Sequence, residues 1–130
     1  MNFKEIIKGK KENGLRVLDY EVRSRKKSLA EIILEVELER KKDLWVARGV
    51  GPVEAVFKLL RDKLNYDGAI LSSFSPVVRG EGVKAQLQVM CSIEYKNKTY
   101  WGRSISEDVT KSPVDAVIDV FSNMHFLLSK

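Results

Sequence analysis

The sequence predicts an α+β domain made of two βββα units related by a pseudo-twofold axis, with antiparallel sheets packed against helices. Three observations support this class: a repeated motif, two segments in which apolar and polar residues alternate, and two helix starts marked by proline. The chain has 130 residues, of which 44% are hydrophobic and 32% are charged. That length and composition are typical of one compact domain with a single core.

A sequence repeat organises the chain. Residues 45–56 (Trp-Val-Ala-Arg-Gly-Val-Gly-Pro-Val-Glu-Ala-Val) are similar to residues 101–117, which share the initial tryptophan and a final Pro-Val-acid-Ala-Val run. Trp45 and Trp101 are 56 positions apart, whereas the two prolines are 61 apart, so the second copy has the longer loop. We therefore divide the chain into a lead-in (1–13), a first unit (14–64) and a second unit (65–130).

Alternating side chains predict the strands. In residues 32–40 leucine and valine alternate with glutamate, and in residues 85–96 apolar side chains alternate mostly with polar ones. A period of two indicates a strand that is buried on one face. The expected strands are residues 14–23, 32–40 and 44–48 in the first unit and 69–78, 85–96 and 99–105 in the second, with turns at 41–43 and 97–98.

Each unit is expected to end in a helix. Residues 51–54 (Gly-Pro-Val-Glu) and 112–115 (Ser-Pro-Val-Asp) supply an N-cap residue, a proline at the first helical position and an acid at the third. Both acids suit the positive end of a helix dipole. The apolar residues that then follow the helical period are Val53, Val56, Phe57, Leu60 and Leu64 in the first helix and Val114, Val117, Ile118, Phe121, His125 and Leu128 in the second.

The residues needed for catalysis or metal binding are sparse. The chain has one histidine and one cysteine, and we interpret both His125 and Cys91 as packing residues on apolar faces. We expect no catalytic residue, no metal site and no cofactor. A single cysteine excludes an internal disulfide and is typical of a reducing cytoplasm. We see neither a membrane-spanning run nor a signal-peptide cleavage site, so we expect a cytoplasmic protein.

The glycine-rich turn at residues 49–54 is the clearest candidate for ligand binding. It follows a strand and opens a helix, but Glu54 stands where a dinucleotide fingerprint has its third glycine, and Pro52 removes an amide. Amides at the positive end of a helix can hold a carboxylate. The glycines are equally explained if they only permit the tight turn.

The formal net charge of +5 raises the question of nucleic acid binding. Many of the basic residues fall in predicted turns, where they more often form a solubilising rim than a groove. The aromatic residues show no Gly-Phe-rich RNA-binding signature, and both tryptophans take matched repeat positions, which suggests packing. We therefore keep a basic RNA-binding module only as an alternative.

Several of these motifs together resemble a known family. They are residues 45–55, the Leu-Asn-Tyr-Asp run at 64–67, the Lys-Ala-Gln-Leu run at 84–87, and residues 101–109 with Ser112. The chain is similar over roughly residues 14–128 to the C-terminal regulatory domain of 2-isopropylmalate synthases and citramalate synthases, the LeuA-type allosteric or dimerisation domain. Position 104 departs from the pattern, because it is serine where many relatives have glycine.

The resemblance implies a homodimer with a pocket for leucine or isoleucine where the two units meet near the dimer interface. Asp67 is our candidate partner for the ammonium group of that amino acid. The effector-binding residues that the resemblance implies are Gly49, Gly51, Pro52, Val53, Tyr66, Asp67, Ala69, Leu71, Ala85, Leu87 and Ile105.

The resemblance also implies feedback control of a synthase. Binding of the amino acid would shift the packing of the two units, and this shift would inhibit a catalytic partner. The catalytic barrel of such synthases is not in this chain, so we expect a regulatory domain and not an enzyme. A dimerisation scaffold without a ligand is the other alternative. The choice of effector, the synthase that is served and whether the domain is free-standing stay open.

Overall fold

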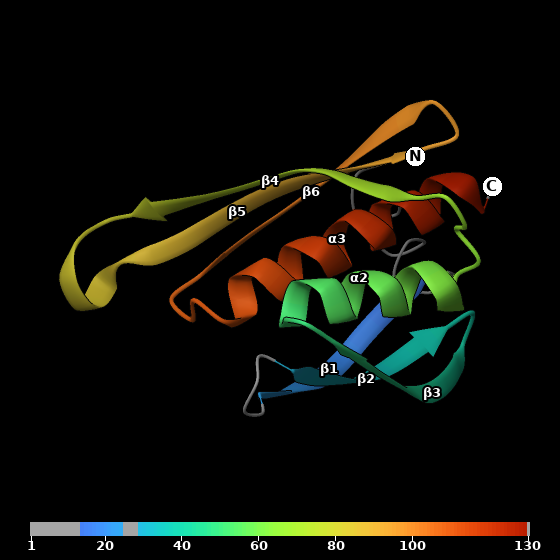
Figure 1. Cartoon of the computed structure of the whole chain (residues 1–130), viewed down its shortest axis with the longest axis horizontal. Coiled ribbons are helices and arrows are strands. Elements are labelled where there is room, and N and C mark those ends of the chain that lie inside the picture. Colours follow the sequence, from blue (N-terminus) through green and yellow to red (C-terminus); the bar gives the residue numbers. More distant parts are fainter. Residues whose placement is uncertain (1–13, 25–28, 130) are drawn as a thin grey trace.

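The computed structural model describes residues 14–24 and 29–129, and it consists of two antiparallel three-stranded sheets with two helices between them (Figure 1). The expected α+β class is confirmed. The predicted lead-in, residues 1–13, lies outside the described residues. The elements are β1 (Leu15–Ser24), β2 (Ala30–Leu38), β3 (Lys41–Gly49), α2 (Pro52–Lys63), β4 (Ile70–Arg79), the short 3-10 helix η2 (Gly82–Lys84), β5 (Gln86–Tyr95), β6 (Lys98–Ser106) and α3 (Lys111–Leu128).

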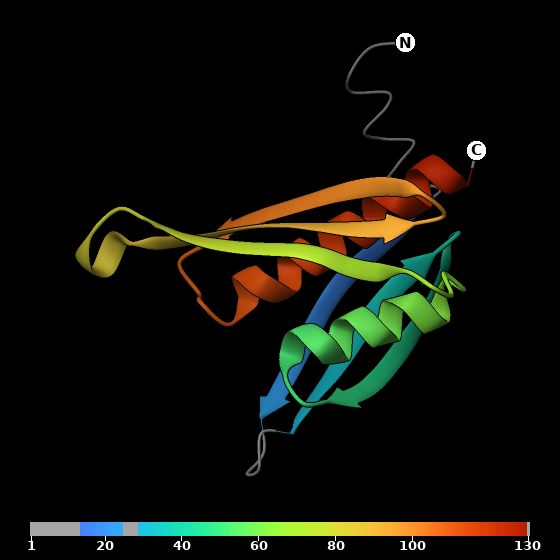
Figure 2. The ribbon, with the colours of Figure 1, turned by 45° about the horizontal axis from the view of Figure 1, so that its top comes forward.

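The two middle strands bury one face each, as their alternation predicts. Ile32, Leu34 and Val36 of β2 have no exposed surface, and the same holds for Val89, Cys91 and Ile93 of β5. Helix α2 packs on β2 and β3, whereas α3 packs on β5 and β6 and also contacts β1. The two helices run in the same direction and contact each other, so they form a shared middle layer (Figures 1 and 2).

The centre of the seam between the units is filled by side chains. The rings of Phe57 and Phe121 lie with centroids 5.6 Å apart, and Val56, Leu60 and Val117 are fully buried around them. At one side the hydroxyl of Tyr20 donates to Asp115 Oδ1 at 2.5 Å, which ties β1 to α3. In the described part of the chain, apolar side chains of both helices therefore occupy the middle of this seam.

The positions of the two hairpin turns show that the two units are offset by one residue more than the tryptophans suggest. Glu39 and Arg40 have positive φ values (50° and 70°), as do Lys96 and Asn97 (51° and 64°), which is the geometry of a two-residue type I′ hairpin. The turns predicted at 41–43 and 97–98 are therefore misplaced, the first by two residues and the second by one. In the structure the matching turn positions are 57 apart, not 56.

That single residue changes the face on which the second tryptophan lies. Trp45 is 5% exposed and belongs to the core, whereas Trp101 is 55% exposed. Because successive strand residues point to opposite faces, a shift of one residue moves a side chain to the other side of the sheet. The prediction that both tryptophans are packing residues is therefore wrong for Trp101. The matched positions of the two tryptophans no longer argue against an RNA-binding function.

Gly102 takes the place in the second unit that Trp45 holds in the first, and it lets α3 approach β6 closely. A Cβ atom at Gly102 would lie 2.4 Å from the backbone nitrogen of Val120 and 2.7 Å from the carbonyl oxygen of Ala116. The first unit has a milder version of this contact, since a Cβ at Gly49 would lie 2.9 Å from the nitrogen of Ala55. In both units a glycine on the last strand therefore lets the helix lie close to the sheet.

The two helix starts differ in how well the sequence predicted them. Helix α2 begins at Pro52 with Gly51 as the N-cap, as expected. Helix α3 begins at Lys111 with Thr110 at the N-cap, so the assignment of Ser112 as the N-cap is wrong. Ser112 is fully buried, and its hydroxyl donates to the carbonyl oxygen of Leu87 at 2.6 Å. The second helix therefore starts two residues earlier than expected, and Ser112 instead joins it to β5.

We expect Gly102→Ala to destabilise the fold, because the added methyl group meets backbone atoms of α3 that have no room to move. Overpacking of this kind typically costs about 1–3 kcal/mol. Gly51→Ala is the control, since a Cβ at Gly51 has no heavy atom within 4 Å and an alanine N-cap costs about 1 kcal/mol or less relative to glycine. Urea unfolding of both variants measures the difference. Equal losses would contradict the close approach at Gly102.

Candidate functional site

The turn from β3 into α2 is the part of the predicted site that the structure supports most directly. Gly51 is extended (φ −160°) and Pro52 begins the helix. The amide of Val50 donates to Glu54 Oε2 at 3.0 Å, and Glu54 Oε1 lies 2.6 Å from Lys58 Nζ. The hydrogen bond from Lys58, followed by that from Val50, lowers the pKa of Glu54. This carboxylate is thus occupied by its own neighbours.

The two glycines of this turn have different roles. Gly49 is explained by packing, because a side chain there would meet Ala55. Gly51 has open space where a side chain would stand, and it offers no side-chain cap to the first turn of α2. The first-turn amides of a helix have no partner within the helix itself. The amides of Val53 and Glu54 at this end are therefore the groups that a carboxylate would meet.

The equivalent end of α3 is closed by its own loop. Asp108 Oδ1 accepts hydrogen bonds from the amides of Thr110 (2.9 Å) and Lys111 (3.1 Å), and the hydroxyl of Ser106 accepts one from the amide of Asp108 (3.0 Å). The longer loop of the second unit thus supplies an acidic side chain that the first unit lacks. Of these two helices, only α2 has an N-terminus without such a cap.

Four other predicted residues lie at the far end of α2, in the connection to β4. Tyr66 and Ala69 are 8% and 4% exposed and belong to the core, and Leu71 packs against it from β4. Asp67 is exposed. Since α2 has twelve residues and a helix rises 1.5 Å per residue, its two ends are about 17 Å apart. One amino acid cannot contact both Gly51 and Asp67 of the same chain.

The remaining predicted residues lie on the second sheet near the helix N-termini. Ala85 lies just before β5, and Leu87, the second residue of that strand, accepts a hydrogen bond from the hydroxyl of Ser112 in α3. Ile105 of β6 pairs with Gln88 and not with Leu87. Its side chain is 54% exposed and points to the opposite face of the sheet from that of Leu87. Leu87 and Ile105 therefore do not line the same side of a pocket.

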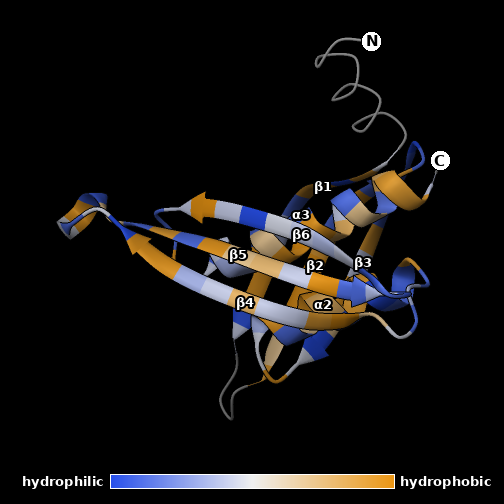
Figure 3. Ribbon diagram, turned by 90° about the horizontal axis from the view of Figure 1, so that it is seen from above, coloured by the Kyte–Doolittle hydropathy of each residue, from blue (hydrophilic) through white to orange (hydrophobic). Residues whose placement is uncertain are grey.

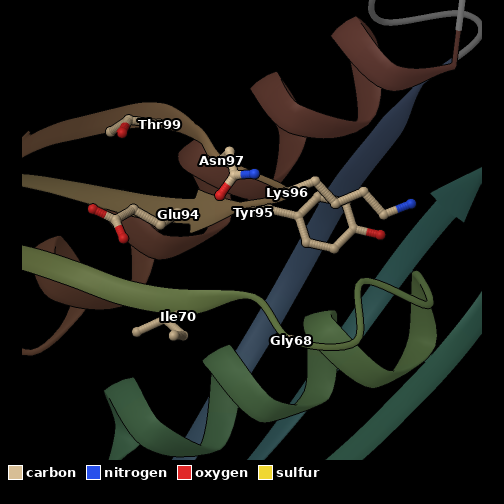
Figure 4. Close-up of a pocket in the computed structure, with 7 residues that line it drawn as sticks. All are labelled: Gly68, Ile70, Glu94, Tyr95, Lys96, Asn97 and Thr99. Carbon is tan, nitrogen blue, oxygen red and sulfur yellow. The ribbon is translucent and has the colours of Figure 1, made fainter.

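Two of the surface depressions in the described part of the chain adjoin the second sheet. The larger has a volume of about 400 Å³ and is lined by Gly68, Ile70, Glu94, Tyr95, Lys96, Asn97 and Thr99 (Figure 4). The other, of about 360 Å³, is lined by Gln88, Arg103, Ser104 and Ile105.

Sequence reasoning missed Glu94 and Lys96 in the larger depression. Their only sequence signal is that they end an alternating strand just before a turn. Ile70 and Glu94 lie side by side there, whereas Lys96 extends along Tyr95, with its ammonium 5.2 Å from the ring centroid (Figure 4). Both charged groups are exposed, so solvent screens them.

His125 and Tyr66 form a polar contact inside the core. The Tyr66 hydroxyl lies 2.9 Å from His125 Nδ1, and burial, followed by the nearby Tyr95 and Tyr100, raises the pKa of Tyr66 to about 12. Burial also lowers the pKa of His125, whose Nε2 is buried without a hydrogen-bond partner among the described residues. His125 is thus a partly buried residue beside the core, where burial disfavours its charged form.

The described residues also show little that could act as a nucleophile or hold a metal. Burial raises the pKa of the Cys91 thiol to about 11, so it is not a thiolate near neutral pH. Within residues 14–24 and 29–129, no group of three or more His, Cys, Asp or Glu side chains is placed to bind a metal ion. Neither helix in that part of the chain has the length and hydrophobicity needed to cross a lipid bilayer.

We expect stability to fall on mild acidification because of His125. Its pKa is lowered in the folded state relative to about 6.5 in the unfolded chain. Below that value the unfolded chain binds a proton that the folded chain resists, so the free energy of unfolding decreases as the pH falls from 7 to 5.5 and is flat above 7. Urea unfolding at pH 7.5, 6.5 and 5.5 measures this. His125→Asn is the control, and an unchanged pH slope in that variant would contradict the assignment.

Comparison with known proteins shows which family the chain matches. Residues 2–125 match the family described as the LeuA allosteric (dimerisation) domain. A 2-isopropylmalate synthase of Pseudoalteromonas atlantica is 26% identical over 110 residues, which are 85% of this chain and 21% of that protein. One from Campylobacter jejuni is 34% identical over 77 residues, 59% of this chain and 15% of that protein.

A third relative, the 2-isopropylmalate synthase of Buchnera aphidicola subsp. Macrosiphoniella ludovicianae, is 32% identical over 74 residues, 57% of this chain and 14% of that protein. The chain thus spans about a fifth or less of the length of these relatives. The family match, by contrast, covers nearly the whole chain and agrees with two βββα units in the structure. The chain belongs to the LeuA allosteric (dimerisation) domain family.

Proposed function

We propose that this chain is a homodimeric regulatory domain that binds a branched-chain amino acid, leucine or isoleucine. It would control a catalytic domain or subunit of the 2-isopropylmalate or citramalate synthase type in the cytoplasm. The observation that carries the proposal is the uncapped N-terminus of α2 with open space at Gly51. It lies toward the same end of the molecule as the start of β5 (Figure 2). We take the walls of the pocket to come from Ala85 and Leu87, which lie at that start in the sequence and have small and branched apolar side chains.

The chemistry of this end suits an amino acid with an apolar side chain. A carboxylate at a helix N-terminus contributes about 0.3–2 kcal/mol. Burial of a leucine-sized side chain contributes about 1.5–3 kcal/mol, and each methylene group about 0.8 kcal/mol. Discrimination among leucine, isoleucine and valine is therefore expected to be modest unless the shape of the pocket adds to it.

The second candidate function is a dimerisation scaffold without a ligand. Two observations favour it: the seam between the units is filled, and two of the predicted effector residues, Tyr66 and Ala69, have core roles. A scaffold predicts a stable dimer whose unfolding temperature is the same with and without amino acids.

Thermal unfolding and calorimetry with leucine, isoleucine, valine and lysine separate the two candidates. We expect leucine or isoleucine at millimolar concentration to raise the unfolding temperature, because a ligand that binds only the folded state stabilises it. Lysine is the control, since its ammonium end does not suit an apolar wall. No stabilisation by any branched-chain amino acid would leave the scaffold as the function.

The role of the α2 N-terminus has a sharper test in Gly51→Asp. The new carboxylate caps α2 and stabilises the helix, typically by about 1 kcal/mol or less, while it occupies the amides that the effector needs. We expect a stable fold and at least a tenfold loss of amino acid affinity by calorimetry. Thr110→Asp is the matched control, because it adds a carboxylate to α3, whose first turn Asp108 already caps. Unchanged affinity in Gly51→Asp would place the effector elsewhere.

A further inference from the structure

The second sheet has one side that faces the helices and one outer side, and Figure 3 looks onto the outer side. Strand pairing shows which side chains point outward. Cys91 is fully buried on the helix side, so its neighbours Met90 and Ser92 point to the outer side. Their partners on β6, Arg103 and Trp101, point the same way. Because Trp101 is 55% exposed, this face presents an indole ring beside a guanidinium group.

The neighbours of Trp101 across the sheet are serines. Ser92 is 2% exposed, and its Oγ lies 2.8 Å from that of Ser72 and 2.6 Å from that of Ser73. The three hydroxyl groups therefore satisfy one another's hydrogen bonds. Since serine side chains are short, they leave the indole ring of Trp101 accessible to a ligand.

The second sheet is also more basic than the first. Strands β1, β2 and β3 contain six acidic residues, and three of their arginines, Arg16, Arg23 and Arg48, each form an ion pair with a glutamate. Strands β4, β5 and β6, which are described in full, contain one acid, Glu94, and three basic residues. These three are Arg79, Lys98 and Arg103.

The two arginines of the outer face carry charge that no carboxylate neutralises among the described residues. The carboxylate of Asp119 accepts a hydrogen bond from the backbone amide of Arg103 at 2.9 Å. Arg79 Nε donates to the neutral Oε1 of Gln88 at 3.0 Å. Glu94 lies four residues along β5 from the partner of Arg103, which is about 13 Å. Positive charge is therefore left unpaired next to the exposed indole ring.

The smaller surface depression lies on this sheet as well. It has a volume of about 360 Å³ and is lined by Gln88, Arg103, Ser104 and Ile105. On the outer face of β6, Arg103 lies between Trp101 and Ile105, about 7 Å from each along the strand. An aromatic ring, a cation, a side-chain amide and an apolar side chain thus lie along one path across the sheet.

We propose that the outer face of the second sheet binds a single strand of nucleic acid. One base stacks on Trp101, and phosphates meet Arg103 and Arg79. The next base enters the depression, where the amide of Gln88 faces its polar edge. Aromatic side chains on an open sheet hold unstacked bases in this way, and such stacking tolerates many sequences. This function is separate from amino acid regulation, and it uses the second sheet and not the basic turns.

The unpaired arginines favour nucleic acid over an apolar protein surface. Burying Arg103 and Arg79 against apolar side chains would remove them from water without a counter-charge, which is costly. A nucleic acid strand brings a phosphate with each nucleotide and releases counterions when arginines bind it. A single strand is required, because the bases of a duplex are already stacked on one another and cannot reach Trp101.

Fluorescence anisotropy of the full chain with labelled oligo-uridine and oligo-thymidine, each about ten nucleotides long, tests the site. We expect both to bind at about 50 mM salt and to bind more weakly at about 200 mM. Trp101→Ala is expected to lose at least fivefold in affinity, whereas Trp101→Phe, which keeps a ring, retains most of it. Leu44→Ala is the matched control, since Leu44 is 64% exposed on the outer face of the first sheet, and it should bind like the wild type.

Two further readouts separate a direct contact from a loss of structure. Trp45 is 5% exposed, so quenching of tryptophan fluorescence by the oligonucleotide reports Trp101 and should disappear in Trp101→Phe. Arg103→Gln is expected to reduce the slope of log affinity against log salt by about 0.7, the value for one phosphate contact on a single strand. Arg48→Gln, whose arginine is paired with Glu31 on the first sheet, should leave the slope unchanged. Circular dichroism shows that each variant is folded.

Three results would overturn the proposal. The first is that neither oligonucleotide binds the wild-type chain at about 50 mM salt. The second is equal binding by wild type and Trp101→Ala, which would assign the affinity to the basic turns. The third is a change in sedimentation of Trp101→Ala in a chain that binds no oligonucleotide, which would assign this face to a protein partner. Equal affinity for the two oligonucleotides supports stacking alone, and a preference for oligo-uridine supports an added contact with the 2′-hydroxyl group.

Discussion

The fold depends on a single layer of two helices that serves two sheets. A three-stranded sheet with one helix buries too little apolar surface to be stable alone, so each unit needs the other. Helix α3 shows the consequence, because its side chains contact β5, β6, β1 and α2, and six of its apolar residues have no exposed surface. The contact of Phe57 with Phe121 lies where the two units meet.

Sharing the helices also explains why the centre of the domain is densely packed. Protein interiors are packed to the density of organic crystals, and large apolar side chains from both helices occupy the space between the sheets. The pocket that we propose therefore lies at an end of the helix layer. There the backbone amides of a helix are accessible, because the sheets do not cover the helix end on both sides.

The two units differ most clearly at the N-termini of their helices and on the outer faces of their sheets. The first unit has a bare glycine N-cap on α2, and the second has a longer loop whose Asp108 closes α3. The first sheet carries paired charges on its outer face, such as Arg48 with Glu31 at 2.9 Å, whereas the second exposes Ile70, Val77, Met90, Trp101 and Ile105. A duplicated domain has thus become asymmetric in its surface while both units keep the same order of strands and helix.

The sequence by itself determined the number and order of the strands, the start of α2 and the class of the fold. Period-two alternation in β2 and β5, and proline after glycine at position 52, are local patterns that need no knowledge of the partner element. Only the tertiary structure decided which way Trp101 faces, because two positive-φ turn residues set the strand register and a shift of one residue reverses every side chain. It also decided that Leu87 and Ile105 point to opposite faces of the second sheet, since the pairing of β5 with β6 sets that register.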